Sequence, residues 1–141
     1  MSTNAPVSAD QPASLRGRPL SVSLTVKDLQ KSLAWYHEVV GFSIDERFER
    51  EGKVRAVALK AGDVRIVIGQ DDGAKGWDRI KGQGFSLQIT TDQNVDEIAK
   101  RIKRLGGTLE SEPADMPWGA RIFRLLDPDG FKLTISSVRS T

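Results

Sequence analysis

Apolar and polar residues alternate over residues 21–26, the two-residue period of a strand with two unlike faces. From residue 29 to residue 40 the apolar positions recur instead at helical spacing. Asp28 is suited to cap the start of this helix, and Gly41 to end it in a left-handed conformation. Three short strands are predicted next: 42–48, 54–59 and 64–68. The first half of the chain therefore predicts a βαβββ unit.

The same order returns from residue 86. Alternation over 86–90 predicts a strand, and a helix follows over 95–105, with Asn94 and Glu97 as a capping box. Three further strands are predicted: 108–112, 120–126 and 131–136. Equivalent positions lie 65 residues apart at the first strands (21 and 86) and 67 at the last (67 and 134). So steady an offset indicates an internal duplication.

The predicted fold class is α+β, with two tandem βαβββ modules that form one shared curved sheet, a cup with the helices on its outside. Module one spans residues 19–68, module two spans 85–137, and the domain as a whole spans 19–138. The linker 69–84 is rich in glycine. Residues 1–18 combine prolines with small polar residues and predict a disordered tail.

Composition excludes several function classes. The chain has 141 residues, no cysteine and one histidine, His37, so it holds no thiolate site and no site that needs two imidazoles. Its net charge of +2 comes from scattered basic residues, which does not favour a nucleic-acid partner. No apolar run is long enough to span a membrane, and no signal peptide is recognisable at the start. We expect a cytoplasmic protein.

Strand alternation also predicts which side chains line the cup. The apolar positions should pack under the helices; they are Val22, Leu24, Val26, Ile66, Ile68, Leu87, Ile89, Leu133 and Ile135. The alternate positions should face the cup; they are Ser21, Ser23, Thr25, Arg65, Val67, Ser86, Gln88, Thr90, Lys132, Thr134 and Ser136. Hydroxyls and two cations on one face suit a polar or anionic small molecule. Alternatively, the two cations extend to solvent at the rim.

Two tryptophans are further candidates. Trp77 lies in the linker among few apolar residues, and Trp118 precedes a predicted strand. Each is suited to form a flat wall beside a planar ligand. The alternative is that exposed aromatic residues fill a dimer interface.

Residues 21–42 and 117–130, with the Asp-Pro-Asp-Gly turn at 127–130, resemble the vicinal oxygen chelate superfamily, which includes glyoxalase I, bleomycin-resistance proteins and extradiol dioxygenases. The resemblance implies a cup of two modules. It also implies metal-ligand positions that fall here on Ser21, Val67, Ser86 and Thr134. None is a histidine or a carboxylate, so we expect a member without a metal or other cofactor.

The favoured hypothesis is a homodimeric, non-enzymatic protein of the bleomycin-resistance type that holds a polar or planar small molecule in the cup, with no catalytic residue assigned. The expected ligand-binding residues are Ser21, Ser23, Arg65, Ser86, Gln88, Lys132, Thr134, Trp77 and Trp118. One alternative is a lyase, isomerase or dioxygenase of the same superfamily. Another is a structural or regulatory dimer with no ligand. Modules that pair within one chain and modules that pair between chains both fit the pattern.

Overall fold

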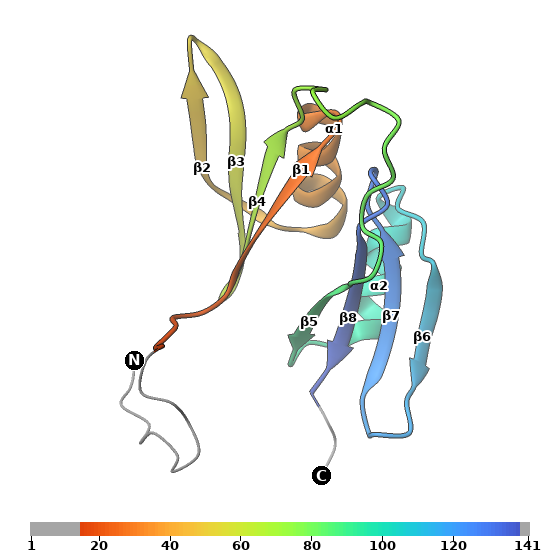
Figure 1. The fold of residues 1–141 in the computed structure, drawn as a ribbon. Helices are drawn as coiled ribbons and strands as arrows, with labels where there is room; N and C mark the ends of the chain where they lie inside the picture. The colour runs from red at the N-terminus through yellow and green to blue at the C-terminus, as the bar shows by residue number, and fades with distance from the viewer. Residues whose placement is uncertain (1–14, 139–141) are drawn as a thin grey trace.

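A computed structural model describes residues 15–138 of the chain, so most of the predicted tail lies outside the described residues. The first module contains β1 (Ser21–Val26), α1 (Leu29–Ala34), the π-helical segment η1 (Trp35–Val40), β2 (Ser43–Arg50), β3 (Lys53–Ala61) and β4 (Val64–Gln70). The second contains β5 (Leu87–Thr91), α2 (Val95–Arg104), β6 (Ser111–Asp115), β7 (Arg121–Leu126) and β8 (Lys132–Ser137). Figure 1 shows the two modules side by side, joined by the linker.

Each module forms a four-stranded sheet of the same topology. The strand order is β1-β4-β3-β2 in the first, here called sheet A, and β5-β8-β7-β6 in the second, sheet B. The first and last strands of each module pair in parallel, and the other neighbours are antiparallel. This arrangement confirms the α+β class and the tandem βαβββ modules.

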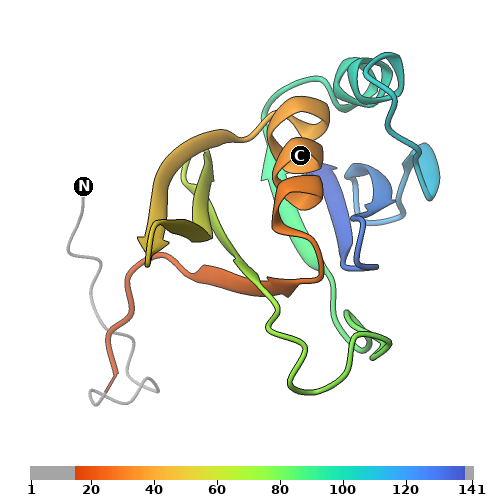
Figure 2. The same ribbon diagram turned by 90° about the horizontal axis from the view of Figure 1, so that it is seen from above.

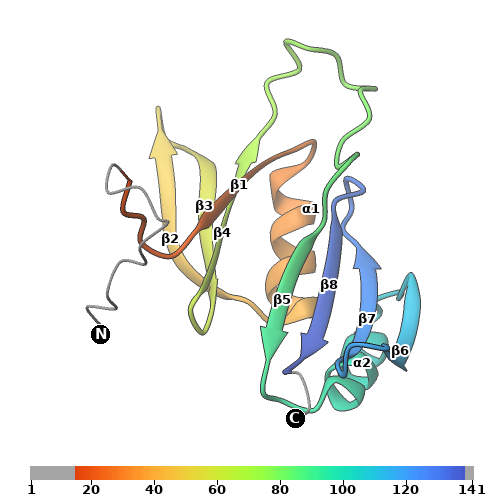
Figure 3. The ribbon, with the colours of Figure 1, turned by 60° about the horizontal axis from the view of Figure 1, so that its bottom comes forward.

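The predicted single sheet takes a different form in this chain, because sheets A and B are hydrogen-bonded separately. Their inner edges are β1 and β5, as Figure 3 shows. From above, α1 lies between the two sheets (Figure 2). A helix in that position keeps the two edges from pairing as neighbouring strands within one chain.

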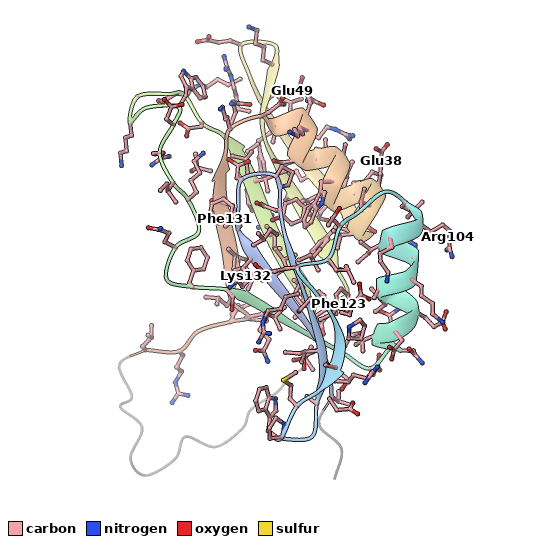
Figure 4. All side chains as sticks on the ribbon, turned by 90° about the vertical axis from the view of Figure 1, so that its right-hand side faces the viewer. Glu38, Glu49, Arg104, Phe123, Phe131 and Lys132 are labelled. Carbon is pink, nitrogen blue, oxygen red and sulfur yellow. The ribbon has the colours of Figure 1, made fainter. Side chains whose placement is uncertain are left out.

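One hydrophobic core connects the modules. The predicted inward positions all belong to it; Val22, Leu87 and Ile89 are partly buried and the other six are buried. Both helices lie on the same side of the strands in Figure 4. The opposite face of each sheet, which no helix covers, is called its open face below.

The helix ends confirm two predicted caps. The side chain of Asp28 accepts a hydrogen bond from the Lys31 amide, and that of Asn94 accepts one from the Glu97 amide. Gly41 ends η1 with φ of 111°, a conformation that side chains other than glycine rarely adopt. The π-helical turn itself was not predicted. It ends with the amides of Gly41 and Phe42 both donating to the Tyr36 carbonyl.

Tyr36 also ties the modules together. Its hydroxyl donates a 2.8 Å hydrogen bond to the Asp127 carboxylate in the turn between β7 and β8, and the tyrosine is fully buried. From the other side, Arg101 of α2 donates to the carbonyls of Val39 and Val40 at the end of η1. These bonds fix how the two sheets are placed relative to one another.

Candidate ligand-binding site

On the open face of sheet A, a hydroxyl, a cation and a carboxylate lie at one end of the strands. Ser21 of β1 is the register partner of Arg65 on β4, and both were predicted to face the cup. The guanidinium Nε of Arg65 lies 3.8 Å from a carboxylate oxygen of Asp45 on β2. Ser23, the next predicted residue on this face of β1, is exposed and lies two register pairs further along, opposite Val67.

Sheet B carries an equivalent set. The ammonium of Lys132 lies 3.8 Å from a carboxylate oxygen of Glu110. Ser86 immediately precedes β5, whose first residue, Leu87, is paired with the residue after Lys132. The offsets from Ser21, Arg65 and Asp45 to Ser86, Lys132 and Glu110 are 65, 67 and 65 residues, the spacing of the duplication itself. We call each set a Ser–cation–acid trio.

The two acids of these trios were not among the predicted site residues. Strand alternation predicts hydroxyls and cations on the cup faces, and the structure adds Asp45 and Glu110 beside the cations. The repeat offset relates these two acids in the sequence and is the signal that could have identified them. Each cation thus has an acid 3.8 Å away, while the side chains of Arg65 and Lys132 are 36% and 42% exposed at the edge of the open face.

The remaining predicted residues on sheet B differ in exposure. Gln88 and Thr134 are register partners on neighbouring strands. Gln88 is exposed, whereas Thr134 has only 4% of its surface exposed. Ser136, further along β8, is also buried and donates to the backbone carbonyl of Ser137. In the single chain, Gln88 on the edge strand β5 is therefore more accessible than Thr134 on β8.

Two large cavities open on these faces. One of about 880 Å³ lies against sheet B and is lined by Ser86, Lys132 and Glu110, together with the linker and Phe85. In Figure 4, Phe131 and Lys132 are seen at the start of β8, and the Phe85 and Phe131 ring centroids are 6.0 Å apart. The other, of about 800 Å³, lies at the far end of sheet A and includes Phe48 and Thr25. Each is lined by one module and the linker.

The structure does not bring the two predicted tryptophans to these cavities. Trp77 is half exposed and packs over Gly73, where it lines a smaller hollow of about 420 Å³ with Lys27 and Lys31. Trp118, also half exposed, lies in the hairpin between β6 and β7. The polar candidates thus group on the open faces, whereas the aromatic ones lie elsewhere in this chain.

The linker is anchored by buried charges. Asp71 has 5% of its surface exposed and lies 2.9 Å from the Lys81 ammonium, which also lies 3.3 Å from Asp129 in module two. The hydrogen bond from Lys81, with others from the Gly73 amide and Arg79, holds the pKa of the Asp71 carboxyl well below its ordinary value. The carboxylate therefore stays charged and keeps the linker in place.

Burial has the opposite effect at the Tyr36–Asp127 bond. Desolvation raises the pKa of the Tyr36 hydroxyl far above its ordinary value, and the neighbouring Asp127 charge adds to the shift. Desolvation likewise raises the pKa of Asp127, although the hydrogen bond from Tyr36 works against this. This pair stabilises the junction between the modules and does not face either cavity.

The residues present do not fit a metal of the kind that the resemblance implies. Val67 lies between Ser23 and Ala58 on the open face and offers no donor atom, while Arg65 and Lys132 bring positive charge close to the corresponding positions. Across residues 15–138, no three His, Cys, Asp or Glu side chains are grouped to hold an ion. His37 is exposed on η1, with its Nδ1 2.7 Å from the Phe42 carbonyl oxygen.

Comparison with known proteins identifies the family. Residues 18–135 match the Glyoxalase/Bleomycin resistance protein/Dioxygenase superfamily, and the chain belongs to it. Lactoylglutathione lyase of Salmonella typhimurium is 27% identical over 124 residues, which cover 84% of this chain and 90% of that protein. Glutathione transferase FosA of Serratia marcescens is 25% identical over 115 residues, 81% of this chain and 76% of that one.

Solved structures share the fold. TnmS3, an antibiotic binding protein from Streptomyces sp. CB03234, superposes with a TM-score of 0.69 at 24% identity, over 89% of this chain and 98% of its own. This likeness supports the assignment of the fold. Within the described residues, no helix is both long and apolar enough to cross a membrane.

Proposed function

We propose that this protein binds a polar or planar small molecule on its open faces without a metal and without turnover. The observation that carries the proposal is the pair of Ser–cation–acid trios. At the ends of the sheets where the resemblance implies metal ligands, each module presents a hydroxyl and a cation held beside an acid. Hydroxyls and fixed cations recognise anionic and polar groups by hydrogen bonds.

The binding unit is proposed to be a homodimer. Within one chain the two large cavities are each lined by a single module with the linker, and α1 lies between the sheets. A second copy that brings its sheet B against sheet A of the first would join β1 and β5 edges and enclose both trios in one cup. Such an arrangement also covers backbone edges that would otherwise remain unpaired.

A second candidate, an enzyme of the same superfamily, is favoured by the likeness to lactoylglutathione lyase and FosA. It would require donors that the open faces of this chain do not supply. Among the described residues the open faces offer Gln88, the two trio acids, each beside a cation, and Glu46, the register partner of Ala58. In the described part of the chain, no three acids or histidines are grouped there to hold an ion.

The decisive experiment measures metal, ligand and oligomeric state on the same sample. Native mass spectrometry of freshly purified, untagged protein should show a dimer, and elemental analysis should show substoichiometric Ni, Zn, Mn and Fe. No lactoylglutathione should form when methylglyoxal and glutathione are incubated with the protein and each of these ions. Stoichiometric bound metal, or formation of lactoylglutathione in the presence of an added ion, would favour the enzyme and reject the metal-free proposal.

A further inference from the structure

The cavity at the far end of sheet A was not anticipated as a site. It lies where the β2–β3 hairpin and the start of the linker meet, at the opposite end of the sheet from the Ser21 trio. In Figure 1 the hairpin tip and the linker are at the same end of the molecule, and Figure 4 labels Glu49 there. Its volume of about 800 Å³ is ample for a small organic molecule.

One wall of this cavity is aromatic. Phe48 of β2 is 38% exposed and lines the cavity. Its register partner on β3 is Ala56, and the partner of Ala56 on β4 is Gly69. Neither residue is large enough to cover the phenyl ring, so the ring is left available to stack against a planar molecule.

A β-bulge adds a cation to the same face. Phe48 pairs with Ala56, but the next residue, Glu49, pairs with Val54, which leaves Arg55 as an extra residue in β3. Val54 and Val57 both pack against the core, so the residues between them, Arg55 and Ala56, share the open side. The bulge therefore directs Arg55, which is exposed, into the cavity that Arg50 also lines.

The charges around the cavity leave a positive excess. Asp71 is occupied by Lys81 and Arg79, and the Asp72 carboxylate accepts a hydrogen bond from the Ala74 amide. Arg50, Arg55 and Lys75 also line the cavity, and the structure of residues 15–138 gives none of the three an ion pair. Glu49 and Asp72 are the remaining acids on the lining, so its four cations, with Arg79 included, outnumber its three acids by one.

We propose that this cavity binds an aromatic compound that bears a negatively charged group, with the ring against Phe48 and the charge near Arg50 and Arg55. The proposal rests on the function proposed above and names the ligand class. A carboxylate, sulfonate or phosphate would accept hydrogen bonds from the two guanidinium groups, which match such planar or multi-oxygen acceptors well. The anchored linker keeps the opposite wall in place.

Two probes that differ by one charged group test the proposal: 8-anilinonaphthalene-1-sulfonate and its neutral analogue N-phenyl-1-naphthylamine. Calorimetric titration of the full chain should show one sulfonate probe per protomer, bound at least about tenfold more tightly than the neutral one. Arg50→Gln and Arg55→Gln should each weaken the sulfonate about tenfold and leave the neutral probe unchanged. Phe48→Ala should weaken both probes about fivefold.

Arg47→Gln is the matched control. Arg47 of β2 pairs with Val57 of β3, so it points to the other side of its strand from Phe48, and it is exposed. Its loss removes the same charge from the same strand and should change neither affinity. Circular dichroism on every variant checks that the fold is intact.

The outcomes separate this inference from the proposed function. Equal affinity for the two probes, or sulfonate binding that survives both Arg50→Gln and Arg55→Gln, overturns the inference. If Lys132→Gln then abolishes binding, the molecule still binds small ligands, but on sheet B. Binding of neither probe, together with no ligand in native mass spectra, counts against both.

Discussion

The two modules agree at one end of their open faces and differ at the other. Both carry a Ser–cation–acid trio at the start of their first strand. At the far end, module one has a long hairpin of eight- and nine-residue strands with Phe48, whereas module two has a five-residue β6 and a short hairpin that carries Trp118. The shared end is therefore expected to provide the common part of recognition, and the divergent end to provide ligand selectivity.

The helix-covered faces of the two sheets also differ: both are apolar, but their buried side chains differ in size. Val57 of β3 pairs with Ile68, and Phe123 of β7 pairs with Ile135, so Val57 and Phe123 occupy equivalent positions in the two modules. Both are fully buried. Module two thus fills with one phenyl ring a position that module one fills with an isopropyl group, and its core should depend more heavily on that position.

The largest expected effect tests this difference. Phe123→Ala should lower the free energy of unfolding by about 4 kcal/mol, because it removes a buried ring and leaves a cavity. Val57→Ala should cost about 2 kcal/mol, since less apolar surface is lost. Urea unfolding followed by circular dichroism measures both. Figure 4 shows Phe123 within module two.

Leu126→Ala, on the same strand as Phe123, is the control for the two core variants. Leu126 is 43% exposed, and its truncation should change stability by less than about 0.5 kcal/mol. Because one hydrophobic core joins the modules, both core variants should unfold in a single transition. Two separate transitions would show that the modules are energetically independent.

The two helical segments contact the opposite module differently: Tyr36 of η1 donates to a buried carboxylate, whereas Arg101 of α2 donates to backbone carbonyls. Tyr36→Phe tests the first of these contacts. The change leaves the ring in place and removes the hydroxyl that donates to Asp127. It should cost about 1–3 kcal/mol, because a buried carboxylate loses a hydrogen bond. The loss should be greater at pH 7 than near pH 4. Burial raises the pKa of Asp127, and the hydrogen bond from Tyr36 opposes this by favouring the charged carboxylate. Removing the hydroxyl therefore costs most stability at a pH where the carboxylate is charged.

Urea unfolding of Tyr36→Phe at the two pH values measures this difference. The double variant with Asp127→Asn shows whether the two groups act through each other. If the hydrogen bond accounts for the loss, adding Tyr36→Phe to Asp127→Asn should cost less than Tyr36→Phe costs alone. An equal cost in both backgrounds and at both pH values would assign the effect to packing.

Much of the fold follows from the sequence because periodicity reports burial directly. The alternation at 21–26 and 86–90 identified the covered faces correctly, and the capping residues Asp28 and Asn94 marked the helix starts. The strand predicted at 108–112 lies three residues later, at 111–115. Gly106, with φ of 95°, follows the end of α2, and the extra loop residues before β6 carry no periodic signal.

The site was less predictable because it depends on how strands are paired. Ser21 and Arg65 could be placed on one face from alternation alone. Arg55 could not, because its orientation is reversed by a bulge that exists only through pairing with β2. The π-helical end of the first helix is similarly hidden, since it depends on the tertiary position of Tyr36.

Asp71, which anchors the linker, should have a smaller effect on stability that depends on pH and has no equivalent in module two. Asp71 has its pKa lowered by the bond from Lys81, so its contribution to stability is present above the ordinary carboxyl pKa and is lost as the pH falls through the lowered value. The equivalent position in module two, by the offset of 67, is Val138, which does not titrate. Asp71→Asn should therefore reduce stability at pH 7 and make it fall less between pH 7 and about pH 3.

Thermal unfolding at a series of pH values checks this expectation, with Asp72→Asn as the neighbouring control. Asp72 is exposed, and within the described residues its carboxylate accepts a hydrogen bond only from the Ala74 amide. Its replacement should leave the shape of the pH profile unchanged. A wild-type profile reproduced by Asp71→Asn would show that the buried carboxylate is not responsible for acid sensitivity.

The smallest expected effect tests the likeness of the two trios. The charged atoms are 3.8 Å apart in both ion pairs. The side chains are similarly exposed, at 36% for Arg65 and 41% for Asp45, against 42% for Lys132 and 35% for Glu110. Arg65→Gln and Lys132→Gln should therefore each change stability by less than about 0.5 kcal/mol, because solvent screens exposed pairs. If the trios bind ligand rather than stabilise the fold, these variants unfold like the unaltered protein in urea yet retain less of any ligand seen in native mass spectra. A stability loss above about 1 kcal/mol in one variant alone would show that the two trios, though placed alike, are not equivalent.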